Sequence, residues 1–223
     1  MQKILIIEDD IGILNSLRLY LTQSSFDIST CDNGTEAMLV FDQVKPDLII
    51  LDINLPGKNG IEICREIRER NNTPIIILSA RGDEDDKIMA LDLGADDYVA
   101  KPFSPRELLA RINSVLKRFS NNKEIKKGEE FIIFKNLRLD IRNFTLFLKD
   151  ELVKITKTEF ELLRYIIENK DEVVLREKIM KDIMGYDNYL YDRTLDTHIK
   201  NLRKKIGEEI EIETIRGIGY KVR

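Results

Sequence analysis

Five short apolar runs in the first 100 residues constrain the fold of this chain more than any other feature of its sequence. They are Ile4–Ile7, Ile28–Cys31, Leu48–Leu51, Ile75–Leu78 and Tyr98–Ala100. Several of their residues are β-branched, and the intervals between the runs are long enough for helices that cross over between strands. Such alternation is typical of an α/β fold, here a doubly wound, five-stranded parallel sheet with helices on both faces.

Polar residues follow four of these runs at the point where each predicted strand ends. Glu8 and Asp9 follow the first run, and Asp52, Ser79 and Lys101 follow the third, fourth and fifth. The carboxyl ends of parallel strands lie at one edge of the sheet, where ligands bind in such folds. We therefore expect these side chains to converge there.

The charges of these side chains indicate phosphoryl chemistry. Glu8, Asp9 and Asp52 would repel one another unless protonated or bridged by a cation, and their hard oxygens suit Mg²⁺. Lys101 adds a positive charge, so this edge is suited to receive a phosphoryl group on an aspartate. Asp52 is the best candidate because it ends the central run and precedes the turn-forming loop INLPGKNG. A single aspartate after a strand is more often a helix cap, but the four positions together favour the phosphoryl site.

Composition excludes several classes of protein. With 223 residues, 43% hydrophobic and 34% charged, the chain suits one or two globular domains and is neither fibrous nor disordered. Acidic residues follow Ile4–Ile7 at once, which argues against a signal peptide or a membrane span, so we expect a cytoplasmic protein with no membrane partner. Cys31, Cys64 and the lone His198 offer too few soft ligands for zinc, and both cysteines are expected to be reduced and buried.

The two halves of the chain differ in charge. Residues 1–120 contain 14 Lys and Arg against 20 Asp and Glu, whereas residues 121–223 contain 22 against 20. Around the division, the segment from Phe119 to Gly128 is polar and has no hydrophobic periodicity, which is typical of a linker and less often of an ordinary surface loop. The prediction is a first domain at 1–118, a linker at 119–128 and a second domain at 129–223.

The second domain is predicted to be a small α+β fold. The alternating segments FIIF, LRLDI, FTLFL and ELVKI indicate an antiparallel sheet that begins at residue 131. A first helix follows Thr156, which has capping-box spacing with Glu159, and two further helices are expected at Leu175–Ile183 and Asp192–Ile206. Two strands then form a hairpin around the turn Arg216–Gly219.

The third of these helices suggests nucleic-acid binding. Leu195, Ile199, Leu202 and Ile206 mark a core face, while the five cations of the helix lie largely elsewhere. A basic helix alone is most often a solvated face. A helix-turn-helix followed by a glycine hairpin with Arg216 at its tip is the winged-helix arrangement for duplex DNA, with the helix in the major groove and the arginine in the minor groove.

Residues 1–118 resemble the receiver domain of two-component signalling. The resemblance rests on LIIEDD, LDINLPGKNG, ILSA and DDYVAKPF. It implies a flavodoxin-like sheet in which Asp52 accepts a phosphoryl group from a histidine kinase. It also implies a Mg²⁺ site made by Asp9, Asp52 and the Asn54 carbonyl, with Glu8 acting through water.

The same resemblance assigns the other residues of this edge. Ser79 and Lys101 would hold the phosphoryl oxygens, and the Lys101–Pro102 peptide would be cis. Tyr98 matches the switch aromatic of the family, which turns inward when Ser79 moves toward the phosphate. Without the resemblance, Tyr98 would be taken for a tyrosine at the edge of the core.

The chain as a whole resembles the regulators of the OmpR/PhoB type, in which the helix after Pro105 contributes to a two-fold dimer interface. The periodicity of this helix separates an apolar face from a stripe formed by Glu107, Arg111, Ser114 and Arg118. Such a stripe is usually a solvated face. The resemblance instead implies ion pairs between subunits, namely Lys87 with Glu107, Asp97 with Arg111 and Asp96 with Arg118. Asp92 would face Asn113, so one pair of the family is missing.

The second half is similar to the effector domain of these regulators through TKTEFELL, YDRTLDTHIKNLRKKIG and TIRGIGYKV. The resemblance implies phosphate contacts, which fix register, by Arg193, His198, Lys200 and Arg203. Thr197 and Asn201 would face bases, and an asparagine favours adenine. Thr214, Arg216 and Tyr220 would line the wing. The loop Met184–Tyr191 would contact RNA polymerase, although packing against the third helix explains it nearly as well.

The predicted function is a transcriptional regulator, not an enzyme, that dimerises on phosphorylation and binds paired promoter half-sites. The alternative is a Mg²⁺-dependent phosphohydrolase with an aspartyl-phosphate intermediate. That class has an acid two residues after its nucleophile, where this chain has Asn54, so the acyl phosphate should persist as a signal. A regulator that works without phosphorylation is disfavoured because every residue of the phosphoryl site is present.

Overall fold

The computed structural model of the chain describes residues 1–79, 89–120, 131–185, 194–207 and 210–223. These residues form two compact units, Met1–Leu116 (unit 1) and Lys117–Arg223 (unit 2). In the described part of the chain, no helix combines the length and the apolar character needed to cross a membrane.

Unit 1 contains a five-stranded parallel sheet in the order β2-β1-β3-β4-β5. The strands are β1 (Lys3–Ile7), β2 (Asp27–Cys31), β3 (Leu48–Asp52), β4 (Ile75–Ser79) and β5 (Asp97–Ala100). Each begins and ends within one residue of a predicted run. The agreement is close because a strand covered by helices on both faces must be apolar throughout, and every residue of β3 and β4 is buried.

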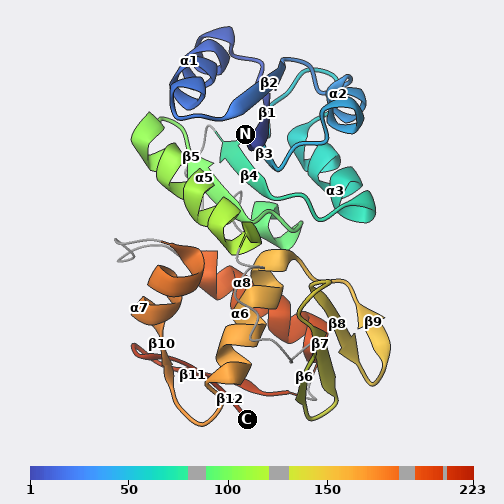
Figure 1. Ribbon diagram of the computed structural model, residues 1–223, viewed down its shortest axis with the longest axis vertical. Helices are drawn as coiled ribbons and strands as arrows, with labels where there is room; N and C mark the ends of the chain where they lie inside the picture. The colour runs from blue at the N-terminus through green and yellow to red at the C-terminus, as the bar shows by residue number, and fades with distance from the viewer. Residues whose placement is uncertain (80–88, 121–130, 186–193, 208–209) are drawn as a thin grey trace. The chain divides into compact units, whose positions relative to one another are not determined.

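Helices cover both faces of this sheet, as Figure 1 shows: α1 (Ile11–Gln23) and α5 (Pro105–Ser120) lie on one face, α2 (Ala37–Val44) and α3 (Gly60–Arg70) on the other. The side chain of Asp10 caps α1 by accepting hydrogen bonds from the backbone N–H groups of Gly12 and Ile13, at 2.8 and 3.0 Å. Asn59 and Glu62 form a capping box at the start of α3. These caps fix the point at which the chain leaves the ends of β1 and β3.

Helix α5 departs from the sequence prediction at its C-terminal end. Its apolar face is buried as expected, but Ser114 and Arg118 of the predicted exposed stripe are also buried, at 8% and 5% exposure. The helix continues to Ser120, so it includes Phe119 and Ser120 of the segment predicted as a linker, and residues 121–128 lie outside the described part. Contacts within unit 2 hold this end of the helix: Arg118 donates to Oγ1 of Thr158 at 3.1 Å, and the carbonyl of Phe119 accepts from Lys157 at 2.8 Å.

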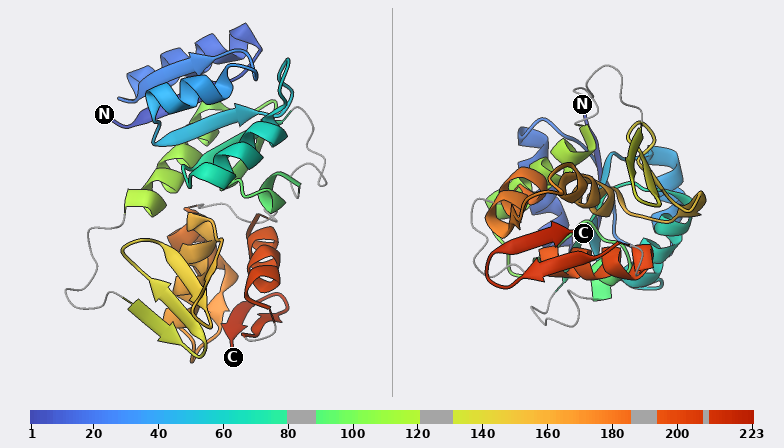
Figure 2. Two further views of the ribbon diagram at one scale, coloured as in Figure 1. Left: turned by 90° about the vertical axis from the view of Figure 1, so that its right-hand side faces the viewer. Right: turned by 90° about the horizontal axis from the view of Figure 1, so that it is seen from below.

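Unit 2 begins with the tail of α5 and a four-stranded antiparallel sheet in the order β6-β7-β8-β9. These strands are β6 (Phe131–Phe134), β7 (Leu137–Asp140), β8 (Thr145–Leu148) and β9 (Glu151–Val153). Helix α6 (Lys157–Glu168) follows, capped by Thr156 and Glu159 in the predicted capping box. Figure 2 shows the sheet to one side of α6 and a later helix, α8 (Thr194–Ile206), on the other.

The segment predicted as one helix at Leu175–Ile183 is divided. It forms strand β10 (Val174–Leu175), helix α7 (Arg176–Ile179) and the π-helix η2 (Met180–Met184). Strand β10 joins β12 (Gly219–Val222) and β11 (Ile212–Ile215) in a three-stranded sheet. The approach is close because residue 219 has no side chain: a Cβ atom there would lie 2.0 Å from the carbonyl oxygen of Val174.

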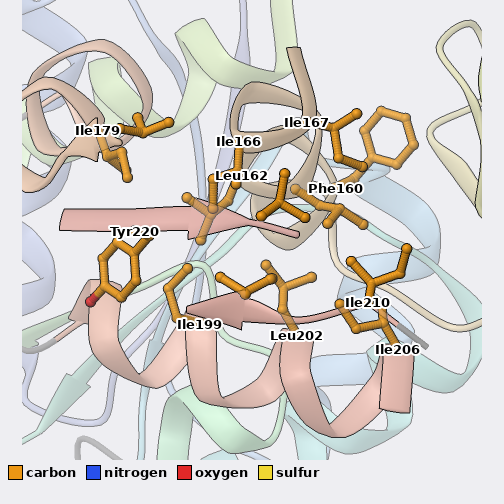
Figure 3. Close-up of a cluster of buried hydrophobic side chains, with 14 of the residues drawn as sticks. Phe160, Leu162, Ile166, Ile167, Ile179, Ile199, Leu202, Ile206, Ile210 and Tyr220 are labelled. Carbon is orange, nitrogen blue, oxygen red and sulfur yellow. The ribbon is translucent and has the colours of Figure 1, made fainter. Parts of the chain in front are cut away.

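The core of unit 2 lies between α6 and α8. Leu195, Ile199, Leu202 and Ile206 of α8 are at most 1% exposed, as their spacing predicted. Figure 3 shows Ile199, Leu202 and Ile206 directed toward Phe160 and Ile166 of α6. The opposite face of α8 is therefore available for polar side chains.

Candidate functional site

Three acidic side chains gather at the carboxyl edge of the sheet in unit 1. Glu8 and Asp9 follow β1, and Asp52 ends the neighbouring strand β3. Each contributes a carboxylate oxygen to a group whose members all lie within 4.8 Å of one another. Glu8 and Asp52 are buried and Asp9 is exposed. The convergence predicted from the strand ends is thus present in the structure.

Lys101 adds a positive charge to this acidic group. Its Nζ atom lies 2.7 Å from Oε2 of Glu8 and 2.8 Å from Oδ2 of Asp52. Its backbone N–H donates to the carbonyl of Ser79 at 2.7 Å, which holds Lys101 beside the end of β4. Lys101 therefore pairs with two of the three carboxylates, and a divalent cation would balance the remaining negative charge.

Burial alters the proton affinity of two groups in the site. Burial raises the pKa of Glu8 to about 7, although the hydrogen bond from Lys101 acts in the opposite direction. Burial also opposes the charge of Lys101, but the hydrogen bonds to Asp52 and Glu8 outweigh it and raise the pKa of Lys101. At neutral pH the lysine is charged, and Glu8 gives up its proton readily when a second cation enters the site.

The other predicted residues of this edge lie around the acidic group. The backbone N–H of Asn54 donates to Oδ1 of Asp52 at 3.2 Å, which orients one carboxylate oxygen. Ser79 is the last residue of β4 and is 2% exposed. Tyr98 is 5% exposed and belongs to the buried apolar cluster of unit 1. The Lys101–Pro102 peptide is cis, as the resemblance implied.

Two features beside Asp52 were not predicted from the sequence. A Cβ atom at Gly60 would lie 2.0 Å from the carbonyl oxygen of Asp52, so α3 begins in direct contact with the end of β3. A cavity of about 530 Å³ also adjoins Lys101. It is lined by residues of α1 and of the segment after β5: Gly12, Ile13, Ser16, Leu17, Lys101, Pro102, Phe103 and Pro105. No pattern in the sequence indicated this cavity.

Several residues assigned to the dimer interface form ion pairs within this chain. Arg111 lies 3.1 Å from Asp97 and 3.0 Å from Glu107. Asp96 is 1% exposed and accepts from Arg68 at 2.7 Å. Arg118 is buried in unit 2, as described above, and Lys87 lies outside the described residues. Ion pairs between subunits would therefore have to replace contacts that the chain makes internally.

In unit 2, α8 carries the predicted DNA-contacting residues on two different faces. Lys200 and Arg203 are exposed. Thr197, His198 and Asn201 are buried, at 6%, 1% and 7% exposure. Arg193 lies outside the described residues.

The wing formed by β11 and β12 is fastened to the end of α8. Arg203 donates to the carbonyl oxygen of Ile212 at 2.9 Å and to Oγ1 of Thr214 at 2.6 Å. Arg216 is exposed in the turn of the hairpin. Tyr220 is only 3% exposed, because its ring belongs to the core of unit 2. The predicted wing residues thus include one that is buried.

A contact between α6 and α8 was also not predicted. Lys205 lies 2.5 Å from Oε2 of Glu159, the residue that closes the capping box of α6. The same oxygen accepts from the backbone N–H of Thr156 at 2.9 Å. One carboxylate therefore both caps α6 and holds the last turn of α8.

Comparison with known proteins shows what these two units are similar to. Residues 4–113 match the family described as "Response regulator receiver domain", and residues 150–222 match "Transcriptional regulatory protein, C terminal". The chain is 37% identical to the transcriptional regulatory protein ResD of Bacillus subtilis, over 98% of this chain and 95% of that protein. It is 39% identical to the response regulator ArlR of Staphylococcus saprophyticus, over the full length of both.

A solved structure agrees with these matches. The response regulator DrrB of Thermotoga maritima, described as an OmpR/PhoB homolog, is 34% identical, with a TM-score of 0.53 over 99% of this chain and 98% of that one. The similarity therefore extends over both units and includes the order in which they occur.

Proposed function

Because the chain belongs to the OmpR/PhoB-type response regulators of two-component systems, we propose that phosphoryl transfer from a sensor histidine kinase to Asp52 controls its dimerisation and its binding to promoters. The chain is a transcriptional regulator that combines a receiver domain with a DNA-binding domain. We also propose that it binds duplex DNA and acts in the cytoplasm.

The observation that carries this proposal is the position of Asp52 between the other two acids and Lys101. In the proposed step, an oxygen of Asp52 attacks the phosphorus of a phosphohistidine. The bond between phosphorus and the imidazole nitrogen breaks, the imidazole leaves with the bonding electrons, and an acyl phosphate forms on Asp52. Lys101, 2.8 Å from Asp52, compensates the charge that accumulates on the phosphoryl oxygens, and Ser79 donates a hydrogen bond to them.

The acidic group fits a magnesium ion. Glu8, Asp9 and Asp52 offer only carboxylate oxygens, the donors that Mg²⁺ prefers, and they carry more negative charge than Lys101 balances. When bound, Mg²⁺ supplies positive charge next to the phosphoryl oxygens. The exposure of Asp9 leaves a path by which the ion and the phosphoryl group enter.

The lifetime of the acyl phosphate distinguishes a regulator from a hydrolase. The residue two positions after Asp52 is Asn54, whose side chain neither activates water nor protonates a leaving group. We therefore propose that the modification persists and acts as a signal. Rapid release of inorganic phosphate over many turnovers would favour a phosphohydrolase instead.

DNA binding is assigned to α8 and the wing. Lys200 and Arg203 contact phosphates, Thr197 and Asn201 face bases in the major groove, and Arg216 reaches the minor groove. Recruitment of RNA polymerase through the loop Met184–Tyr191 belongs to the same proposal.

Dimerisation is proposed to use β5 and α5. Arg111 and Asp97, paired at 3.1 Å within the chain, would exchange their partners for those of a second subunit. Such an exchange leaves the number of ion pairs nearly unchanged. A small structural change in the phosphorylated receiver can therefore shift the equilibrium between monomer and dimer. Two linked DNA-binding domains then bind paired half-sites more tightly than one domain.

The test compares the parent protein with Asp52→Asn, and uses Asp10→Asn as the matched control because Asp10 caps α1 instead of facing the site. Each protein is treated with acetyl phosphate and Mg²⁺, and the modified residue, the association state and the bound genomic sites are measured. We expect modification at Asp52, association and added site occupancy in the parent and in Asp10→Asn, and none of these in Asp52→Asn. Identical association and occupancy in parent and Asp52→Asn would refute phosphorylation control, and a trapped phosphoryl group on another residue would refute the assignment of Asp52.

A further inference from the structure

Arg176, the first residue of α7, connects three elements of the DNA-binding unit. Its guanidinium donates two hydrogen bonds to the carboxylate of Asp196 on α8, at 2.7 and 2.9 Å. It also donates to the hydroxyl of Tyr220 on β12 at 3.1 Å, and this hydroxyl in turn donates to Asp196 at 2.5 Å. Two parallel bonds between a guanidinium and a carboxylate fix direction as well as distance. The first turn of α8 is thereby tied to the wing through Arg176.

The backbone of Arg176 is fixed to the same wing. Its N–H donates to the carbonyl oxygen of Ile218, in the hairpin turn, at 2.9 Å. The preceding residue, Leu175, pairs with Gly219, whose lack of a side chain permits the close approach described above. Figure 3 shows the ring of Tyr220 at the edge of the apolar cluster with its hydroxyl at the outer end. The backbone of Arg176 is therefore fixed in place, and its guanidinium can hold Asp196 and Tyr220 in fixed positions.

Asp196 stands on the exposed face of α8 that carries the cations. It is the only acidic residue between Thr194 and Ile206, and it shares this face with Lys200 and Arg203. A carboxylate there would repel the phosphates of a duplex unless its charge were balanced. The side chain of Asp196 is 50% exposed and that of Arg176 is 30% exposed. The pair therefore lies on the surface that we propose contacts DNA.

We propose that Arg176 is a positioning residue of the DNA interface: it balances Asp196 and, through Asp196 and Tyr220, sets the angle between α8 and the wing. This inference rests on the proposed DNA-binding function and deepens it, because it assigns a role to a residue outside the predicted contact set. With the angle fixed, the major-groove residues of α8 and Arg216 of the wing engage one duplex together. In this proposal Arg176 does not itself contact a DNA phosphate.

The experiment measures the affinity of the full chain, treated with acetyl phosphate, for two duplexes. One is selected by the parent protein from a random-sequence library, and the other is a scrambled duplex of equal length. The variants are Arg176→Ala, Arg176→Lys, Asp196→Ala and the Arg176→Ala, Asp196→Ala double variant. The matched control is Arg164→Ala, since Arg164 forms an ion pair with Glu168 on α6 and its side chain is similarly exposed, at 26%.

We expect Arg176→Ala to weaken binding to the selected duplex about tenfold, as for loss of a charged hydrogen bond. Binding to the scrambled duplex should change less, Arg176→Lys should recover part of the loss, and Arg164→Ala should match the parent. The double variant should bind no worse than either single variant, because removal of either partner already abolishes the interaction between Arg176 and Asp196. The slope of log affinity against log salt concentration should stay that of the parent, whereas a lost phosphate contact would reduce it by about 0.9.

Three results would overturn the inference while leaving the proposed function intact: unchanged affinity in both Arg176 variants, additive losses in the double variant, or a reduced salt slope. If circular dichroism shows that Arg176→Ala does not fold, Arg176→Lys and Tyr220→Phe are used instead. In each of these variants we expect a smaller ratio of the affinity for the selected duplex to that for the scrambled duplex. A parent protein that enriches no sequence from the library and does not bind the scrambled duplex would overturn both the proposed function and this inference.

Discussion

The ammonium nitrogen of Lys101 lies 2.8 Å from a carboxylate oxygen of Asp52, although 49 positions separate the two residues in the sequence. The same nitrogen lies 2.7 Å from Glu8, so one side chain balances two buried acids. Its removal would leave both carboxylates without their cation in a site that excludes most water.

We therefore expect Lys101→Ala to lower the free energy of unfolding by about 3 kcal/mol at pH 8 in metal-free buffer, the usual result of removing one partner of a buried ion pair. Urea unfolding followed by circular dichroism measures this change. The control is Lys58→Ala, which breaks a more exposed ion pair with Glu66 and should cost less than about 1 kcal/mol. Equal costs for the two variants would show that Lys101 does not compensate the acids.

Two adjacent aspartates offer a direct test of the magnesium site. Asp9 belongs to the acidic group, whereas the side chain of Asp10 accepts from Gly12 and Ile13 at the start of α1. We expect Asp9→Asn to weaken Mg²⁺ binding at least about tenfold, because one charged ligand is lost. Asp10→Asn should bind Mg²⁺ like the parent, since asparagine caps a helix as well as aspartate does. Isothermal titration calorimetry with MgCl₂ measures both, and similar affinities for the two variants would contradict the assignment.

Gly60 should be intolerant of a side chain because of its contact with Asp52. A Cβ atom at residue 60 would lie 2.0 Å from the carbonyl oxygen of Asp52, so the backbone of β3 or α3 must move. We expect Gly60→Ala to lower the free energy of unfolding by about 2 kcal/mol and to slow labelling of Asp52 by acetyl phosphate. Gly12→Ala is the control, because its nearest atom is 3.1 Å away on the side chain of Asp10. Normal labelling and stability in Gly60→Ala would show that the contact relaxes freely.

The thiol of Cys64 should make stability depend on pH in the alkaline range. Burial raises its pKa from 9.0 to about 11, so the folded state favours the protonated thiol. This contribution is complete below about pH 9 and is lost as the pH rises toward 11, and two pKa units correspond to about 3 kcal/mol.

The measurement compares Cys31→Ser, which keeps Cys64 as the single thiol, with the Cys31→Ser, Cys64→Ala double variant. Urea unfolding followed by circular dichroism gives the free energy of unfolding of each at about pH 8 and about pH 10.5. This free energy should fall more between the two pH values in the variant that keeps Cys64, because its buried thiol stays protonated longer in the folded state. An equal fall in both variants would contradict the effect of burial.

Elements whose cause is local could be predicted from the amino-acid sequence. The strands of unit 1 were predicted to within one residue because continuous aliphatic runs have no stable place other than a sheet covered on both faces. The start of α6 was predicted because Thr156 and Glu159 satisfy the free N–H groups of the helix within four residues of chain. The acidic group was also predictable, because parallel strands bring their carboxyl ends to one edge.

The hydrogen-bond partners of polar side chains, in contrast, depend on how the elements pack in three dimensions. No spacing in the sequence indicated that β10 would replace the start of a helix, or that Arg176 would join Asp196 to Tyr220. A local pattern records which face of an element is apolar, whereas a hydrogen bond between distant residues depends on the distance and angle between two elements. Those distances and angles are set by the packing of the whole core, to which every buried side chain contributes.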